Sequence, residues 1–323
     1  MVGRRHFAAV SGAIALEAGL VITWSSGFVG ARLSVDQAAP IFTIQAWRFL
    51  VAALVLAALP QVRRALTDTV AAGGAARVLW RHALTGLLAI VGYIGGIVGA
   101  IATGMPVGTA ALIAALQPLA VAGLASARHR RMPSPRLMAG LALGLAGVAV
   151  TLGTAGMSPA GGAAAVDMVA AGLLALGGTT CLVVATLRST GGLPPAVSLA
   201  VQSAAAAVAF AVVVGVSDGV AALFPRPTPG ILISIAWLVV FSTFGGYGLY
   251  WVCLARSSAL RISCLLWLTP PVTSLWAWAM FGEAPAVQAV AGLALCLAGM
   301  TLTAPRSRST CVPPSAYRRR SAR

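Results

Sequence analysis

Charged side chains are scarce in this sequence of 323 residues. They make up 9% of it, against roughly 25% in an average soluble domain, and only six of them are acidic. Hydrophobic residues make up 59%, and the mean hydropathy is +0.93. This composition cannot give a globule a water-compatible surface, which excludes an ordinary soluble protein. Because the apolar runs reach the roughly 20 residues that cross a bilayer, we expect an all-α integral membrane protein.

Several chemistry-bearing patterns are also missing. Lysine is absent, so a Walker-type phosphate-binding loop cannot form and we expect no ATP hydrolysis. The five cysteines contain no CxxC pair, and four of them lie inside apolar runs, as buried thiols do. The three histidines are scattered and the six acids are dispersed. We therefore expect no metal, no cofactor and no enzymatic activity.

All 22 basic residues are arginines, and they give the chain a net charge of +16. They lie in short stretches between apolar runs, which is typical of membrane orientation and not of a nucleic-acid-binding face. Arg4 and Arg5 precede the first apolar run, as in a signal peptide. That run contains Glu17, is long and lacks a small-residue cleavage site, so we interpret it as a first transmembrane helix.

The apolar runs predict ten transmembrane helices. Pro40, Pro106, Pro195 and Pro285 stand at or beside predicted helix starts, where the missing N–H group of proline costs little. In chain order the segments are 9–31, 40–59, 83–102, 106–126, 137–153, 166–187, 195–216, 231–254, 260–281 and 286–304.

The arginines between these segments predict the orientation. With a cytoplasmic N-terminus, 19 arginines fall on the cytoplasmic side and two, Arg32 and Arg226, on the other, while Arg48 lies within a span. Basic residues are in excess in cytoplasmic loops, so we expect both termini in the cytoplasm and the chain in the inner or plasma membrane. Residues 1–8 form a short N-terminal stretch. The basic tail, 305–323, is expected to anchor the topology and to touch anionic lipid.

The chain repeats itself at an offset of 152 residues. The sequence AGLALGLAGVAVT at 139–151 aligns with AGLALCLAGMTLT at 291–303, with nine identities in thirteen, and Pro118 falls on Pro270. Five helices per half is an odd number, so the second half would enter the membrane upside down, as in many secondary transporters. The predicted fold is therefore two inverted five-helix repeats, residues 9–153 and 166–304.

Short motifs recur in a fixed order along the chain. Residues 23–29 read TWSSGFV in the first segment, and Pro40 stands eight residues before Arg48 in the second. Residues 116–118 read LQP in the fourth segment, and residues 268–270 read LTP in the ninth. In order, spacing and duplication these motifs resemble the drug/metabolite transporter superfamily, specifically its ten-helix branch built from two EamA domains.

The resemblance has two local departures. Ser25 stands where glycine is usual, and Arg130-Arg131 replaces the glycine-glutamate pair that the second half carries at 282–283. The resemblance implies a transporter whose central cavity is lined by helices one to four and six to nine, with helices five and ten outside as scaffold. Family members include exporters of amino acids and other metabolites, nucleotide-sugar carriers and drug-efflux proteins, so the substrate stays open.

Glu17 and Arg48 are the ionisable residues deep in predicted spans. A central charge costs about 2.5–3.5 kcal/mol on insertion scales, so such residues usually face a cavity or a partner. Glu17 shares a helix face with Trp24 and could load and release a proton, because low dielectric favours the neutral carboxyl group. The alternative is a structural carboxylate, neutral or paired with Arg48. Arg48 either binds a substrate carboxylate or phosphate through its guanidinium, or locks helices one and two together.

Two prolines lie inside predicted helices four and nine. Pro118 and Pro270 each free the carbonyl group four residues back, which gives a kink and a polar spot near the membrane centre. Gln117 and Thr269 precede them and are candidates to turn into the cavity. A kink that only improves packing is the alternative.

Aromatic residues gather in the second half. Trp267 lies three residues before Pro270 and is predicted to line a substrate surface, with Tyr247 or Tyr250 opposite and Tyr93 as the candidate in the first half. Core packing is the alternative for each. The candidate substrate and proton pathway is therefore Glu17, Trp24, Arg48, Tyr93, Gln117, Pro118, Tyr247, Tyr250, Trp267, Thr269 and Pro270.

The sequence favours a secondary transporter that works by alternating access. We expect an exporter of a small metabolite, an amino acid or another, with proton coupling through Glu17 as an option. A membrane-embedded enzyme needs acids or histidines clustered at the membrane edge, and these are dispersed here. A non-transporting scaffold is the third class. The expected partners are the small molecule and the lipid bilayer, with no nucleic acid, and a homodimer is left open.

Overall fold

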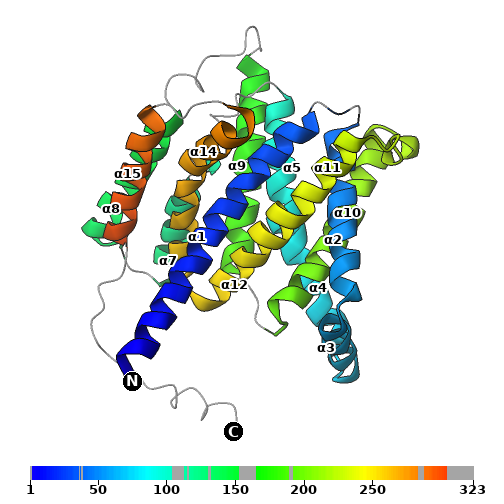
Figure 1. Ribbon diagram of the computed structural model, residues 1–323, viewed down its shortest axis with the longest axis horizontal. Coiled ribbons are helices and arrows are strands. Elements are labelled where there is room, and N and C mark those ends of the chain that lie inside the picture. The colour runs from blue at the N-terminus through cyan, green and yellow to red at the C-terminus, as the bar shows by residue number, and fades with distance from the viewer. Residues whose placement is uncertain are drawn as a thin grey trace.

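The computed structural model describes residues 2–35, 37, 39–103, 113–114, 116–129, 132–152, 165–188, 192–282 and 287–303. Within these ranges the chain forms helices and no strand (Figure 1). The α-helices are α1 (Val2–Val35), α2 (Ile41–Ala58), α3 (Pro60–Ala71), α4 (Ala75–Gly86), α5 (Tyr93–Ala102), α7 (Gln117–His129), α8 (Pro135–Leu152), α9 (Ala165–Leu187), α10 (Pro195–Ser217), α11 (Pro229–Trp237), α12 (Gly248–Arg256), α13 (Ala259–Leu265), α14 (Thr269–Phe281) and α15 (Val287–Thr303). The π-helices are η1 (Leu87–Gly92) and η3 (Leu238–Tyr247), and the 3₁₀-helices are η2 (Val220–Leu223) and η4 (Leu266–Leu268).

Every predicted segment overlaps helical residues in the described ranges, the fourth only from residue 113 onward because the residues before it lie outside these ranges. The helix starts expected at Pro106 and Pro285 also lie outside them. In the described part, five helices are long and apolar enough to cross a membrane. They are residues 41–58, 75–100, 169–187, 195–217 and 229–256. The short helix α3 was not predicted.

Helices from the two predicted halves lie side by side. α2 packs along α10, α5 along α9, α1 along η3, and α8 along α15, the last pair forming one edge of the bundle (Figure 1). A Cβ on Gly140 would lie 2.9 Å from the Gly299 carbonyl oxygen, and one on Gly147 would lie 2.8 Å from that of Gly292. Glycine at these positions therefore allows α8 and α15 to approach backbone to backbone.

The described apolar interior has a main cluster, a smaller cluster around Trp267 and a third around Ala100, Ala171 and Ala175. Leu20, Phe49, Phe210 and Tyr250 belong to the main cluster, in the centre of the bundle. Trp267 is 1% exposed and belongs to the smaller cluster, together with Ala122, Leu141, Cys264 and Cys296. A Cβ on Gly144 would lie 2.1 Å from the Trp267 ring, because the indole fills the space that this glycine leaves on α8. This burial favours core packing of Trp267, the alternative to the predicted substrate surface.

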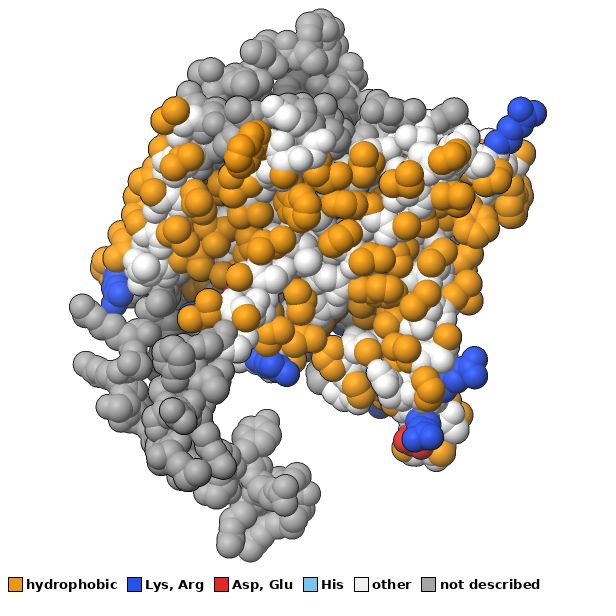
Figure 2. All heavy atoms as spheres, in the orientation of Figure 1, with side chains coloured by type: hydrophobic (Ala, Val, Ile, Leu, Met, Phe, Trp, Pro, Cys, Tyr) orange, Lys and Arg blue, Asp and Glu red, His pale blue; other side chains and the backbone are white. Residues whose placement is uncertain are grey.

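Large apolar side chains also cover the outside. In Figure 2 hydrophobic side chains fill the middle of the visible face, and most of the basic ones lie at the lower edge, the end where α1 begins and α3 lies. Leu173, Val208 and Val290 are each more than 60% exposed. An exposed apolar belt bounded by charge is typical of a chain whose helices face lipid.

Candidate functional site

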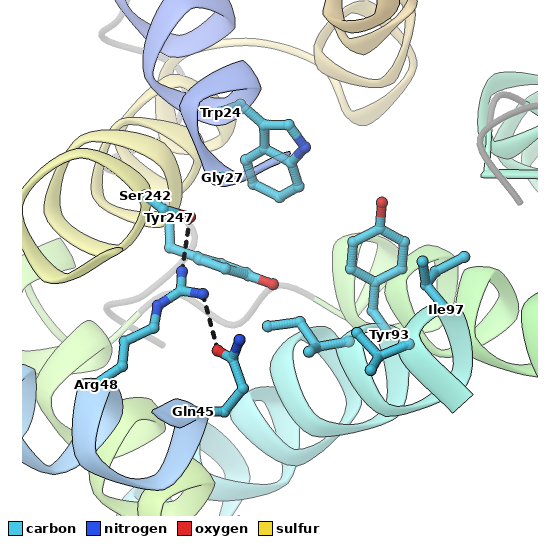
Figure 3. Close-up of a pocket in the computed structure, with 10 residues that line it drawn as sticks. Trp24, Gly27, Gln45, Arg48, Tyr93, Ile97, Ser242 and Tyr247 are labelled. Atoms are coloured by element: carbon cyan, nitrogen blue, oxygen red, sulfur yellow. Dashed lines mark hydrogen bonds between the residues drawn. The ribbon is translucent and has the colours of Figure 1, made fainter. Parts of the chain in front are cut away.

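A cavity of about 130 Å³ lies between helices of the two predicted halves (Figure 3). Its described lining is mostly apolar, and Arg48 is the charged residue in it. The lining residues are Trp24 and Gly27 from α1, Gln45 and Arg48 from α2, Tyr93, Ile94, Ile97 and Val98 from α5, and Ser242 and Tyr247 from η3.

Arg48 is 3% exposed and its hydrogen bonds go to neutral groups. Nε donates to Thr243 Oγ1 at 2.8 Å, and the two terminal nitrogens donate to Ser242 Oγ at 2.7 Å and to Gln45 Oε1 at 3.0 Å. Ser242 and Thr243 belong to η3, so Arg48 joins α2 to η3. Arg48 was predicted to hold the first two predicted helices together. In the structure it instead holds α2 to η3, because η3 presents two adjacent hydroxyl groups to the guanidinium.

Glu17 lies away from this cavity and pairs with Arg261. Its two carboxylate oxygens accept bonds from Arg261 Nε at 2.6 Å and from a terminal nitrogen at 2.8 Å. The Glu17 side chain is 15% exposed and that of Arg261 is 44% exposed. The pair connects α1 to α13, so the alternative pairing of Glu17 with Arg48 is not formed.

Three aromatic side chains from different elements meet at one wall of the cavity. The Trp24 ring centre lies 5.0 Å from that of Tyr247 and 5.2 Å from that of Tyr250. The Tyr247 hydroxyl donates to the Ala89 carbonyl oxygen in η1 at 3.2 Å. Tyr250 is fully buried behind the lining, where it shares a hydrogen bond with Thr186. Tyr250 therefore supports the wall, whereas Trp24 and Tyr247 face the cavity.

The cavity also lies where two helices change their winding. η1 is followed directly by Tyr93, and η3 ends at Tyr247, so each π-helix places a tyrosine at the cavity. π-Helical turns are rare and are found preferentially at functional sites. Hydropathy patterns carry no signal for them, and neither was predicted.

The two proline motifs open helices. Gln117 and Thr269 are the first residues of α7 and α14, and η4 precedes α14. Each proline thus stands second in its helix, where it breaks no intrahelical bond, so the predicted kinks are breaks between helical segments. The amide nitrogen of Gln117 and the hydroxyl of Thr269 are buried, with no hydrogen-bond partner among the described residues. Neither residue lines the cavity.

The structure thus brings four of the predicted residues to one cavity: Trp24, Arg48, Tyr93 and Tyr247. Sequence reasoning missed Gln45 and the hydroxyl pair Ser242 and Thr243. The spacing of Gln45, three residues before Arg48, was an available signal, because that separation brings two side chains to one helix face.

Part of this site lies in a segment that matches a known family. The model of the EamA-like transporter family matches residues 11–153. This part of the chain is therefore similar to an EamA domain. The match includes Trp24, Arg48 and Tyr93, and it indicates a multi-pass membrane transporter of the drug/metabolite transporter superfamily.

Solved structures show a likeness in fold over nearly the whole chain. Fifteen solved chains match, and one, described only as the crystal structure of a protein, superposes with a TM-score of 0.70 at 20% identity. The alignment covers 90% of this chain and 97% of the other, and at this identity it shows a shared fold. No curated protein matches the sequence.

The described part of the chain has no cluster of three or more histidine, cysteine, aspartate or glutamate residues suited to a metal. Arg130, Arg131 and Glu283, where the halves differ in the family motif, lie outside the described residues.

Proposed function

We propose that this protein is a secondary transporter that exports a small metabolite across the inner or plasma membrane by alternating access. The observation that carries the proposal is the cavity, because its walls come from α1, α2 and α5 of residues 9–153 and from η3 of residues 166–304. A site shared by two halves changes its access when the halves rock against each other.

The helix contacts support an inverted-repeat arrangement. Exchanging the halves converts the contact of α1 with η3 into that of α9 with η1, and both contacts occur. With the offset of 152 residues, the same exchange converts the approach of Gly140 to Gly299 into that of Gly292 to Gly147. Tyr93 and Tyr247 are related by an offset of 154 residues. A local two-fold relation between the halves accounts for all three pairs.

The Glu17–Arg261 pair supports a gate that lies outside the cavity. It joins α1 of the first predicted half to α13 of the second. Breaking the pair would remove the charge-assisted bonds between the two helices and so release them from each other. The proposed direction, export, rests on the resemblance of the sequence motifs to a family that includes exporters.

The test is to profile small metabolites in the medium of cells expressing the wild type, Glu17→Gln or Asp218→Asn at matched membrane levels. Asp218 is an exposed acid far along the chain, so Asp218→Asn is the control for losing one carboxylate. We expect one compound class to accumulate with the wild type and Asp218→Asn, and less with Glu17→Gln. Equal export by all three would contradict the gate but keep transport, whereas no accumulation with the wild type would contradict export.

A further inference from the structure

The cavity holds a cation that the described protein does not neutralise. Arg48 is 97% buried, and its hydrogen-bond partners Gln45, Ser242 and Thr243 are all neutral. Among acids whose side chains are described, Glu17 binds Arg261, while Asp68 and Asp218 are absent from the cavity lining. A buried charge without a counter-charge is unfavourable, so an anionic ligand would find a strong partner here.

The hydrogen-bond inventory of the site is rich in donors. A guanidinium has five N–H donors, and three bonds account for part of them, so donors remain on the terminal nitrogens. Gln45 uses its carbonyl oxygen for Arg48, and Figure 3 shows its amide nitrogen on the side away from the guanidinium. The Ser242 oxygen accepts from Arg48, which leaves its O–H group free to donate. These groups complement a carboxylate, which only accepts.

The rest of the cavity limits the size and polarity of the ligand. Trp24, Tyr93, Ile94 and Ile97 make the remaining walls apolar and aromatic. The volume of about 130 Å³ is below the roughly 300–1,000 Å³ of pockets that hold drug-sized molecules. One guanidinium balances one negative charge, which favours a monocarboxylate over a doubly charged phosphate.

We propose that the substrate is a small molecule with one carboxylate and an apolar body. Arg48 and Gln45 bind the carboxylate, and the apolar body lies against Trp24, Tyr93 and Ile97. The proposal rests on the proposed function, in that it takes this cavity as the transport site. It excludes simple organic cations, because a cation would lie beside Arg48 with no carboxylate from the described lining to offset the repulsion.

The experiment compares three probes with one carbon skeleton: 4-methylpentanoate, its methyl ester and 4-methylpentan-1-amine. Purified protein in lipid nanodiscs is titrated with each, and binding is followed as a rise in the thermal unfolding midpoint. Hydrogen bonds to a charged group contribute about 1.5–3 kcal/mol, so the acid should bind about 10- to 100-fold more tightly than the ester or the amine. Equal or stronger binding of either would overturn the proposal, as would no binding of the acid.

Two variants separate the site from general attraction of anions to a basic protein. Arg48→Gln should lose the preference for the acid, whereas Arg226→Gln, which removes an exposed arginine, should keep it. Loss of the preference for the acid in both variants would overturn the proposal. If Arg48→Gln does not fold, binding of the three probes to the wild type decides alone. Export of compounds that lack a carboxylate would leave the transport function standing and refute this inference. Binding of the acid without export of any metabolite would support this inference and refute the transport function.

Discussion

At the scale of single residues, Arg48 connects the fold to the candidate site. It faces the cavity, and it donates to Ser242 and Thr243 on the opposite wall. The same side chain therefore holds α2 against η3 and offers its remaining donors to a ligand. A substitution at a residue with both roles affects folding and binding together, so folding and binding must be measured separately.

Replacing Arg48 with alanine is expected to lower the yield of folded protein. The change removes the guanidinium that donates hydrogen bonds to two buried hydroxyl groups, and each such bond contributes about 1.5–3 kcal/mol. It also leaves a void in a packed interior. The measurement is the monodisperse fraction recovered from membranes by size-exclusion chromatography. Arg226→Ala, at an exposed loop position, should give the wild-type fraction. A normal yield of Arg48→Ala together with lost transport would refute the structural role.

Glu17 and Arg261 should behave as one unit in a double-mutant cycle. Their bidentate bond is partly exposed, so we expect a coupling free energy of about 0.5–1 kcal/mol in unfolding from mixed micelles. Glu17→Gln, Arg261→Gln and the double variant supply the cycle. The charge-exchanged variant Glu17→Arg/Arg261→Glu should recover part of the lost stability. Strictly additive effects would show that the contact contributes nothing.

Sequence reasoning named four of the six polar and aromatic residues that line the cavity and missed Gln45 and Ser242. Arg48 was identifiable because a charge within a span is rare, and its role in binding stays a prediction. The sequence could not show whether Trp267 lines a cavity or packs in the core, because a tryptophan deep in a span is compatible with both. In the structure it fills the space beside Gly144. Ser242 was passed over because a serine in a span carries no charge to mark it.

At the scale of helices, the contact of α8 with α15 depends on missing side chains. Gly147→Ala would place a Cβ 2.8 Å from the Cys296 backbone nitrogen, so the helices must move apart. We expect a loss of about 1–3 kcal/mol in stability, measured as a lower thermal unfolding midpoint. Gly177→Ala is the matched control, because a Cβ there meets nothing within 4 Å and alanine favours the helix. Equal effects of the two changes would contradict close packing at Gly147.

The helices were predictable because a membrane-spanning helix needs about 20 apolar residues in a row. Every predicted segment overlaps helical residues in the described ranges. Their internal irregularities were only partly accessible. Proline marked the breaks before α7 and α14, because it lacks the N–H group that continues a helix. The π-helices η1 and η3 left no mark, because their extra residue per turn depends on what the helix packs against. Those two turns position Tyr93 and Tyr247, so this part of the site required the structure.

At the scale of the whole molecule, the sequence offset, the matched helix contacts and the cavity all support the proposed inverted repeat of two halves. An inverted repeat requires an odd number of spans per half, so equivalent ends of the two halves are expected on opposite membrane faces. Arg63, after the second predicted span, and Arg226, after the seventh, are separated by five predicted spans. The inverted repeat therefore predicts that they lie on opposite sides, and the excess of arginine predicts that Arg63 is on the cytoplasmic side.

Single cysteines at these two positions test that consequence. In a background with the native cysteines replaced, Arg226→Cys should react with a membrane-impermeant maleimide in intact cells, and Arg63→Cys only after the cells are opened. Both positions are exposed in the structure, so failure to react reports the membrane barrier and not burial. The reverse pattern would keep the odd number of spans and invert the orientation. Labelling of both from the same side requires an even number, and a repeat of five helices cannot then be inverted.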